Sequence, residues 1–292
     1  MKKHTVLIVG GSGLIGQRLK YHFEKLNYEV RILSRNKKSK YYWDPVKQII
    51  DSETLYNVNY IVNVCGSSID KRWTKKRKKE IYLSRVTATR FLIDKIKSHN
   101  QKIEKYIGVS AIGYYNYDHL LKNENSKNGD HFLAHVCSDW EVAISKQKEI
   151  PFCLLRLGVV LSNQGGMLKK LLFPFSLNLG SALGSGQQKI SWIHIDDVCR
   201  MILHCIKNEE NQIFNCVSPN PISNEYFSKT LAKALRKKMW KKNIPVFILK
   251  ILFGEMSSMI LENLTVSSKK IEKTGFTFKF PDIEKALENL IN

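Results

Sequence analysis

The sequence predicts an α/β protein with a doubly wound parallel sheet and a smaller, mostly helical C-terminal domain. Through about residue 165, apolar segments of strand length alternate with amphipathic segments of helix length. That alternation is typical of a parallel sheet whose strands are joined by crossover helices. After Ser162 the chain becomes rich in glycine loops and then mostly helical. We therefore expect residues 1–165, with 187–217 returning to them, to form the sheet domain, and residues 166–186 and 218–292 to form the smaller one.

The first predicted strand and the glycines after it indicate a nucleotide site. The apolar run Thr5–Val9 leads directly into a glycine-rich turn, and a helix is predicted from Gln17 to Leu26. A tight turn, the close approach of a pyrophosphate and close packing of the helix each need a residue without a side chain. Backbone N–H groups at the helix start would face the phosphates. This context predicts a dinucleotide-binding Rossmann unit. Its expected cofactor contacts are Gly10, Gly13, Leu14, Ile15 and Gly16.

The second predicted strand, Glu29–Leu33, indicates which dinucleotide fits. NAD-selective sites carry an acidic residue about 20 positions past the glycines, where it binds the ribose hydroxyls. Here that place holds Ser34 and Arg35, with Lys37 and Lys38 close behind. A hydroxyl and a guanidinium bind a 2′-phosphate, which a carboxylate would repel. The sequence therefore predicts NADP(H) rather than NAD(H). The alternative is that Arg35 points into solvent.

Three later strands are predicted to end at the same edge of the sheet. They are Tyr60–Val64, Lys105–Val109 and Phe152–Val160, with helices between them from Thr74 to His99 and from Phe132 to Lys148. Ligands of open α/β sheets bind outside the carboxyl ends of the strands. The residues expected beside the cofactor at these ends are Cys65, Gly66, Ser110, Leu157 and Gly158.

The second part of the chain has fewer readable signals. The segment Ile190–Val198 has the pattern of a short strand that feeds a helix capped by Asp196 or Asp197. Another strand is predicted over Gln212–Val217. Helices are predicted over Asn224–Lys238 and Pro245–Gly254.

Composition limits the classes of function. The net charge is +21, with dense basic runs at 71–79 and 236–242, and such charge attracts nucleic acid or anionic membrane. No helix-turn-helix or aromatic-interleaved basic sheet accompanies it, so we favour a solvated surface of a lysine-rich chain. No apolar run has the ~20 residues of a membrane span, and the N-terminus does not read as a signal peptide. The six scattered cysteines form no C-x-x-C pair, which fits free thiols in the cytoplasm rather than disulfides or a metal site.

Several motifs occur together in one order along the chain. They are Asn63–Gly66, Lys71–Thr74, Ser84–Val86, Ser110–Tyr115, Gly129–Leu133, Trp140–Glu141, Arg156–Leu161, Gly184–Gln187, Ser191–Asp197 and Gly254–Met256. With these motifs the whole chain resembles the extended short-chain dehydrogenase/reductase superfamily. More narrowly, it resembles the atypical "epimerase family" subgroup, which is NAD-dependent epimerase/dehydratase-like. The resemblance implies a Rossmann fold, a bound dinucleotide and oxidoreductase or epimerase chemistry on a small molecule.

The resemblance also reveals a departure from standard members, which use a Tyr-x-x-x-Lys pair and a serine. In those members the tyrosine exchanges the alcohol proton, and the lysine holds the nicotinamide ribose and lowers the tyrosine pKa. If Glu141 is matched to the glutamate that usually follows the pair, Leu133 stands in the tyrosine place and Cys137 in the lysine place. Cys137 would then face the cofactor ribose. A thiol there could be a weak acid or a redox switch, but we favour a small buried packing residue.

The resemblance leaves other hydroxyls for acid–base work. Ser110 stands roughly where the superfamily serine stands and could hydrogen-bond a carbonyl. Tyr114 or Tyr115 could present a phenol near the nicotinamide, although a tyrosine near position 115 usually packs structurally in extended members. These three residues are the catalytic candidates.

Other polar residues have weaker cases. Arg72 and Trp73 follow the third strand and would suit an anionic or planar ligand; a simple helix start explains them equally well. His131 and His135 are four apart on a helix, but no third ligand accompanies them, so no metal site is predicted. His194 begins a His-x-Asp-Asp turn that we interpret as structural.

The sequence leaves three alternative hypotheses for the function. The favoured one is an NADP(H)-dependent oxidoreductase or epimerase with a non-standard acid. The second is a non-catalytic NADP(H)-binding redox sensor or regulator, which the missing Tyr–Lys pair supports. The third, and weakest, is a nucleic-acid-associated protein. The apolar stretches 171–177 and 247–253 suit a hydrophobic substrate, a domain core or the face of a homodimer.

Overall fold

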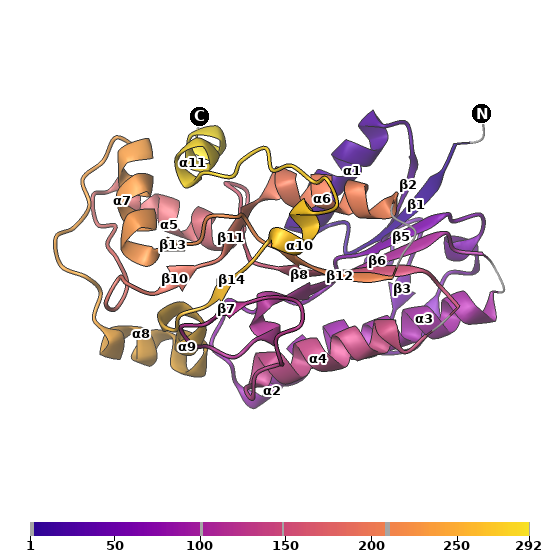
Figure 1. The fold of residues 1–292 in the computed structure, drawn as a ribbon. Coiled ribbons are helices and arrows are strands. Elements are labelled where there is room, and N and C mark those ends of the chain that lie inside the picture. Colours follow the sequence, from indigo (N-terminus) through magenta and orange to yellow (C-terminus); the bar gives the residue numbers. More distant parts are fainter. Residues whose placement is uncertain (1–2, 100–101, 148, 208–210, 292) are drawn as a thin grey trace.

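The computed structural model describes residues 3–99, 102–147, 149–207 and 211–291. Its central feature is a six-stranded sheet with the order β12-β8-β6-β5-β1-β2 (Figure 1). The strands are β1 (Thr5–Val9), β2 (Glu29–Leu33), β5 (Tyr60–Asn63), β6 (Lys105–Ala111), β8 (Phe152–Leu157) and β12 (Gln212–Cys216). Every neighbouring pair is parallel. The doubly wound parallel sheet predicted from the sequence is confirmed.

Helices cover both faces of this sheet (Figure 1). One face carries α1 (Leu14–Lys25) and α6 (Ile195–Ile206), and the other carries α2 (Lys75–Tyr82), α3 (Ala88–Ser98) and α4 (Phe132–Ser145). Strand β1 is buried along its whole length and serves both faces, since side chains alternate along a strand. Val6 and Ile8 join the core under α1 and α6, while Leu7 and Val9 join the core under α3 and α4.

The chain reverses its winding direction next to β1. It first moves outward from β1 to β2 and then returns to pair β5 on the other side of β1. This arrangement makes a topological switch point between β1 and β5. Open α/β sheets bind their ligands at such points, outside the carboxyl ends of the strands.

The predicted helix from Thr74 to His99 contains a change of helical type. Thr74 caps α2 by accepting a hydrogen bond from the Arg77 backbone N–H at 3.2 Å. A π-helical turn, η2 (Leu83–Thr87), then joins α2 to α3. Such a turn adds a residue to the helix and is frequent at functional sites.

The smaller, mostly helical region packs at one end of the sheet (Figure 1). Its helices are α5 (Gly166–Ser176), α7 (Asn224–Ala234), α8 (Val246–Phe253), α9 (Ser257–Leu261) and α11 (Ile283–Ile291), and its short strands include β10 (Lys189–Ile190), β13 (Ile222–Ser223) and β14 (Thr265–Val266). Helix α10 (Lys269–Glu272) instead lies beside β12, where Ile271 joins the core under α1 and α6. Side chains of α5, α7 and α11 form a third apolar core around Trp192. In the described part of the chain, no helix combines the length and apolar character of a bilayer span.

One predicted strand is broken in the structure. The sequence suggested a continuous strand over Phe152–Val160, but β8 ends at Leu157 and β9 (Val159–Leu161) begins a new pairing. Gly158 donates to the Cys216 carbonyl of β12, whereas the next residue, Val159, donates to the Ser191 carbonyl. Since β9 pairs with β11 (Trp192–His194) instead of β12, the chain changes partner at Gly158.

The predicted cap of α6 is corrected. Neither Asp196 nor Asp197 caps this helix, because His194 Nδ1 accepts the Asp196 backbone N–H at 3.0 Å. Asp196 instead binds the guanidinium of Arg18 on α1 at 2.5 and 2.9 Å. Asp197 is fully buried and accepts the backbone N–H groups of residues 279 and 280, both at 2.8 Å.

Smaller differences concern element ends. Helix α1 begins at Leu14 rather than Gln17, and α4 ends at Ser145, while its predicted end at Lys148 lies outside the described residues. The pair β3 (Trp43–Asp44) and β4 (Ile49–Ile50) and the strand β7 (Leu121–Lys122) were not predicted. Two-residue strands carry too little periodicity to be recognised in a sequence.

A buried ion pair joins the helix α4 to the sheet. The guanidinium of Arg156 on β8 donates from Nε and Nη2 to the two carboxylate oxygens of Glu141 at 2.8 and 2.7 Å. Only 2% of Arg156 and 5% of Glu141 is exposed. Because neither charge can be solvated, removing one leaves the other uncompensated.

We expect Glu141→Gln to lower the free energy of unfolding by about 3 kcal/mol or more, since it leaves a buried guanidinium without its anion. Urea denaturation measures the change. The control is Glu24→Gln, which breaks the Lys20–Glu24 pair, whose side chains are 51% and 52% exposed. It should cost less than about 0.5 kcal/mol. Equal, small changes in the two variants would contradict the assignment.

Candidate functional site

The glycine turn lies at the switch point between β1 and β5. Gly10 has a φ of +87°, a conformation that L side chains rarely adopt, and a Cβ there would lie 2.8 Å from Cys65 Cα. Gly16 packs α1 onto the turn, since a Cβ there would lie 2.5 Å from the Gly10 carbonyl oxygen. Gly13 differs from both, because a Cβ there would have only the Gly10 carbonyl oxygen nearby, at 3.3 Å. The turn therefore offers open backbone at Gly13 and nowhere to place a side chain at Gly10 or Gly16.

The start of α1 suits an anion. Gly13 is the N-cap residue, no side chain caps the helix, and its first turn contains no acidic residue. The exposed N–H groups and the helix dipole favour a negative group at this place. Leu14 and Ile15 are half-buried behind it, and Leu14 contacts Gly165, which brings the loop before α5 against the turn.

The end of β2 is positively charged. Ser34 is held in place, because its backbone N–H donates to the Tyr41 carbonyl at 3.0 Å and its hydroxyl accepts the Asn36 N–H at 3.1 Å. Arg35 is exposed, and its charge is close enough to Cys65 to favour the thiolate there. Arg35 therefore lies within electrostatic range of Cys65, at the strand end where the sequence predicted a 2′-phosphate.

Four more predicted cofactor residues lie at the ends of the next strands. Cys65 is half-buried at the end of β5, and its backbone N–H donates to the Asn63 side chain at 3.1 Å. Gly66 follows it directly. Leu157 is half-buried at the end of β8, and a Cβ on Gly158 would lie 2.6 Å from the Ser191 carbonyl oxygen. Gly158 therefore allows the loop at Ser191 to approach this strand end.

Ser110, near the end of β6, and Cys137 of α4 lie beside each other. Ser110 is 2% exposed, and its hydroxyl makes no regular hydrogen bond within the described residues. Burial raises the pKa of the Cys137 thiol to about 11, although the adjacent Ser110 hydroxyl and the nearby guanidinium of Arg85 favour its thiolate. A buried hydroxyl without a regular partner costs free energy, and it is therefore available to a ligand.

The two predicted tyrosines have different environments. The hydroxyl of Tyr115 is completely buried, donates to Asn215 Oδ1 at 2.7 Å and accepts from Arg156 Nη1 at 2.8 Å. Tyr115 is thus fully engaged in the interior, which supports the structural alternative. Tyr114 is half-buried, and its ring lies 3.6 Å from the guanidinium carbon of Arg156.

Sequence reasoning missed a third tyrosine, Tyr117. Its ring stacks on the imidazole of His131, with centroids 4.4 Å apart and planes 4° from parallel. His131 is itself fixed, because it caps α4 through Ala134 and binds the Tyr115 carbonyl at 3.1 Å. The hydroxyl of Tyr117 is buried without a hydrogen-bond partner within the described residues. Burial and the neighbouring Cys137 raise the Tyr117 pKa, so the phenol stays neutral and can donate. No sequence motif marks this residue; its stacking on His131 depends on the tertiary fold.

Arg72 and Trp73 do not stand together as a ligand pair. Trp73 is 8% exposed, and its Nε1 donates to the Ile69 carbonyl at 2.9 Å. Arg72 is exposed and donates to the Ile251 carbonyl of α8 at 3.2 Å. It thereby links the loop after β5 to the C-terminal region.

The basic run at 71–79 is partly neutralised by ion pairs. Lys78 binds Glu255 at 2.6 Å, and Arg77 binds Glu80 at 2.9 Å. Groups of three or more metal-ligating side chains do not occur within residues 3–99, 102–147, 149–207 and 211–291. His135 points to the exposed Asp130 rather than toward a shared ligand with His131.

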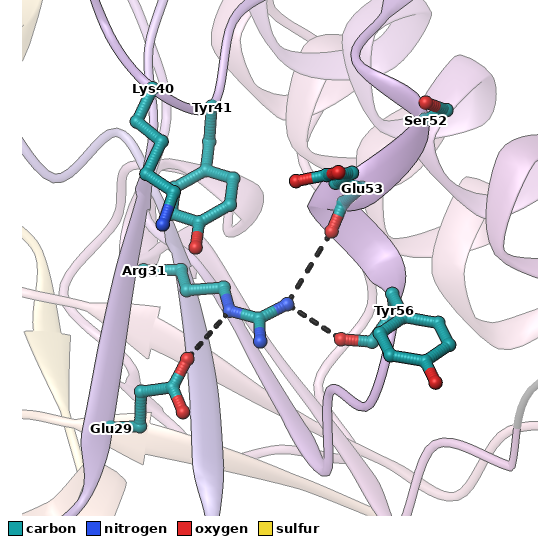
Figure 2. A pocket seen from close by; sticks show the side chains of 7 residues that line it. All are labelled: Glu29, Arg31, Lys40, Tyr41, Ser52, Glu53 and Tyr56. Carbon is teal, nitrogen blue, oxygen red and sulfur yellow. Dashed lines mark hydrogen bonds and ion pairs between the residues drawn. The ribbon is translucent and has the colours of Figure 1, made fainter.

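A hollow of about 490 Å³ lies elsewhere, on the first half of β2 (Figure 2). Its lining residues are Glu29, Arg31, Lys40, Tyr41, Ser52, Glu53 and Tyr56. The guanidinium of Arg31 already has protein partners there, because it donates to Glu29 at 3.0 Å and to the Tyr56 carbonyl at 2.6 Å. The chemistry-bearing residues gather at the opposite strand ends, so we place the candidate site at the glycine turn.

The part of the chain that contains the glycine turn matches a known protein family. The family described as "NAD dependent epimerase/dehydratase family" matches residues 6–216, which include the whole glycine turn. Residues 244–290 match a "Domain of unknown function (DUF1731)".

Related proteins and structures match nearly the whole chain. An epimerase family protein of Staphylococcus aureus (strain MRSA252) is 33% identical, with 98% of both chains covered. The chloroplastic "Epimerase family protein SDR39U1 homolog" of Arabidopsis thaliana is 33% identical over 98% of this chain and 86% of that protein. The structure of human epimerase family protein SDR39U1 with NADPH has a TM-score of 0.91, with 28% identity and 98% of both chains covered. A nucleoside-diphosphate sugar epimerase of Corynebacterium glutamicum has a TM-score of 0.81 and 28% identity, with 99% of this chain and 58% of that chain covered.

The environment of Cys65 predicts a slow thiol. Burial raises its pKa to about 11 despite the nearby charges of Arg85 and Arg35, so at pH 7.5 only about 0.03% is thiolate. We expect Cys65 to react with a disulfide reagent at least about a hundredfold more slowly than thiols of the urea-unfolded chain. The rate should rise about tenfold per pH unit up to pH 10. Comparison with Cys65→Ser isolates the signal, and a fast, pH-independent reaction would refute this prediction.

Proposed function

Because this chain belongs to the NAD dependent epimerase/dehydratase family, as an atypical short-chain dehydrogenase/reductase, we propose that it binds NADP(H) and uses it on a small-molecule substrate. The observation that carries this proposal is the open backbone of Gly13 at the start of an uncapped helix, with the exposed Arg35 directly after the neighbouring strand β2. The helix start suits a pyrophosphate and the guanidinium suits a 2′-phosphate.

The residues present fit a phosphorylated dinucleotide better than an unphosphorylated one. Ser34 and Arg35 end β2, and no carboxylate follows them before Asp44. The human relative whose structure has a TM-score of 0.91 to this chain was solved with NADPH. We propose contacts with the cofactor from Gly10, Gly13, Leu14, Ile15, Gly16, Ser34, Arg35, Cys65, Gly66, Ser110, Cys137, Leu157 and Gly158.

A bound nicotinamide would supply or accept a hydride at a substrate carbon. The chain must then hold the substrate oxygen and exchange its proton. The buried hydroxyls of Ser110 and Tyr117 are without regular hydrogen-bond partners in the described structure, and both lie near Cys137. We therefore assign them as donors to that oxygen, with Tyr114 as the alternative phenol. Since Leu133 and Cys137 replace the usual Tyr–Lys pair, this acid differs from the standard one.

We propose that the C-terminal region closes the substrate side of the cleft. Arg72 binds the backbone of α8, and Lys78 binds Glu255 just after α8. These contacts hold residues 246–255 against the loop after β5. Residues 166–186 approach from the other side through Gly165 and Leu14.

A second function, a non-catalytic NADP(H)-binding sensor or regulator, is supported by the absence of a Tyr–Lys pair. The two functions differ in turnover. An enzyme should oxidise NADPH in the presence of some member of a panel of aldehydes and ketones, whereas a sensor should bind NADPH tightly and consume none.

Titration of protein fluorescence with NADPH and NADH tests cofactor binding. We expect tight binding of NADPH and weak binding of NADH, and Arg35→Asp should reduce that preference by about tenfold or more, since it replaces a charge-assisted contact with repulsion. Gly13→Val is the negative control. It should bind neither dinucleotide, because the valine side chain fills the open face of the turn. Retained affinity in Gly13→Val, or an unchanged ratio in Arg35→Asp, would refute the assignment.

The proton donor is tested by Tyr117→Phe. If turnover is found, we expect kcat to fall by about a hundredfold or more, as for loss of a general acid, while the NADPH affinity stays unchanged. Tyr114→Phe is the matched comparison and should retain most of the activity. The opposite pattern would assign the role to Tyr114.

A further inference from the structure

Arg85 is a half-buried cation that the fold positions at the candidate site. It lies on the π-helical turn η2 between α2 and α3. The added residue of a π turn changes the direction in which side chains leave the helix. The side chain of Arg85 reaches the cleft at the end of β5, where a Cβ on Gly66 would lie 2.8 Å from the guanidinium carbon and 2.9 Å from Nη2.

The guanidinium lacks a strong partner. Its Nη1 donates to the Ile81 carbonyl at 3.3 Å and to the Ser84 hydroxyl at 3.5 Å, both long for an arginine. Its face lies 5.5 Å from the centre of the Trp140 ring. Among the residues that the structure describes, no carboxylate pairs with it, and burial lowers its pKa. A desolvated cation without an anion costs free energy unless a ligand compensates for it.

The charge of Arg85 reaches two other residues of the cleft. It favours the thiolate forms of Cys65 and Cys137, against the larger opposing effect of burial. Cys65 contacts the glycine turn at Gly10. Cys137 stands where standard members of the superfamily carry the lysine that holds the nicotinamide ribose. The positive charge that α4 lacks at position 137 is thus present on the neighbouring π turn, which packs against α4.

We propose that Arg85 supplies, at the nicotinamide end of the cofactor, the positive charge that the missing lysine would have placed there. This inference rests on the proposed function, because it needs NADP(H) at the glycine turn. The oxidised nicotinamide ring is a cation and the reduced ring is neutral. A fixed guanidinium at that end repels the oxidised form and leaves the reduced form unaffected. Arg85 therefore biases the protein toward NADPH over NADP⁺.

The test is the ratio of the dissociation constants of NADP⁺ and NADPH, measured by fluorescence titration and competition on the full-length chain. In Arg85→Met this ratio should fall about tenfold, because the repulsion of the oxidised ring is gone. Arg85→Lys keeps the charge and should keep the ratio within about threefold. Arg85→Gln replaces Arg85→Met if that variant does not fold.

Two further variants separate charge from structure. The double variant Arg85→Met with Cys137→Lys places the cation at the superfamily position and should restore the preference for NADPH. Arg90→Met removes an exposed arginine from the same helical run and should leave the ratio unchanged. A general distortion would weaken both dinucleotides equally and would not be rescued by a lysine at position 137.

The possible failures are distinguishable. If wild-type protein binds neither dinucleotide, the proposed function fails and this inference falls with it. If wild-type protein binds NADPH but Arg85→Met has an unchanged ratio, only the role of Arg85 is overturned. An unrescued double variant with a lowered ratio would assign the effect to packing at Gly66 rather than to charge.

Discussion

The buried pair between Arg156 and Glu141 is the interaction on which the organisation of the site depends. Arg156 binds both carboxylate oxygens of Glu141, the hydroxyl of Tyr115 and the Glu124 carbonyl, and it lies under the ring of Tyr114. A planar guanidinium with five donors can fix several segments at once. It fixes β8, α4 and the loop after β6, which carry Leu157, Cys137 and Tyr115 respectively.

Comparison of Arg156 with Arg85 distinguishes a structural arginine from one whose charge is open to a ligand. Arg156 has a bidentate carboxylate and a phenol, so its charge is compensated inside the protein. Arg85 has two long hydrogen bonds and an aromatic face. Arg156 is buried and its charge is compensated by the described chain, whereas the half-buried Arg85 has no carboxylate partner among the described residues. An uncompensated charge in a cleft is characteristic of binding sites, where the ligand completes the electrostatics.

The sequence was sufficient for features that follow local rules. A glycine turn after a buried strand predicted both the sheet and the anion site at Gly13, because each requirement acts within a few residues. The sequence could not identify features made by distant segments. The Tyr115 hydroxyl donates to Asn215, which lies 100 positions later in the sequence. The stacking of Tyr117 on His131 depends on how the loop after β6 folds back. His194 caps α6 in place of the expected aspartate. Asp197 instead accepts a backbone N–H from the C-terminal segment.

A cation on η2 and a lysine on α4 are not chemically equivalent, and the difference limits the reaction. A lysine beside a tyrosine lowers the phenol pKa so that it can give and take protons. Here burial and a neighbouring thiol raise the pKa of Tyr117, and the charge of Arg85 is not among the influences on it. The guanidinium itself stays protonated in proteins and cannot relay a proton. With NADPH bound as proposed above, the neutral hydrogen-bond donors Ser110 and Tyr117 would suit reduction of a carbonyl better than oxidation of an alcohol.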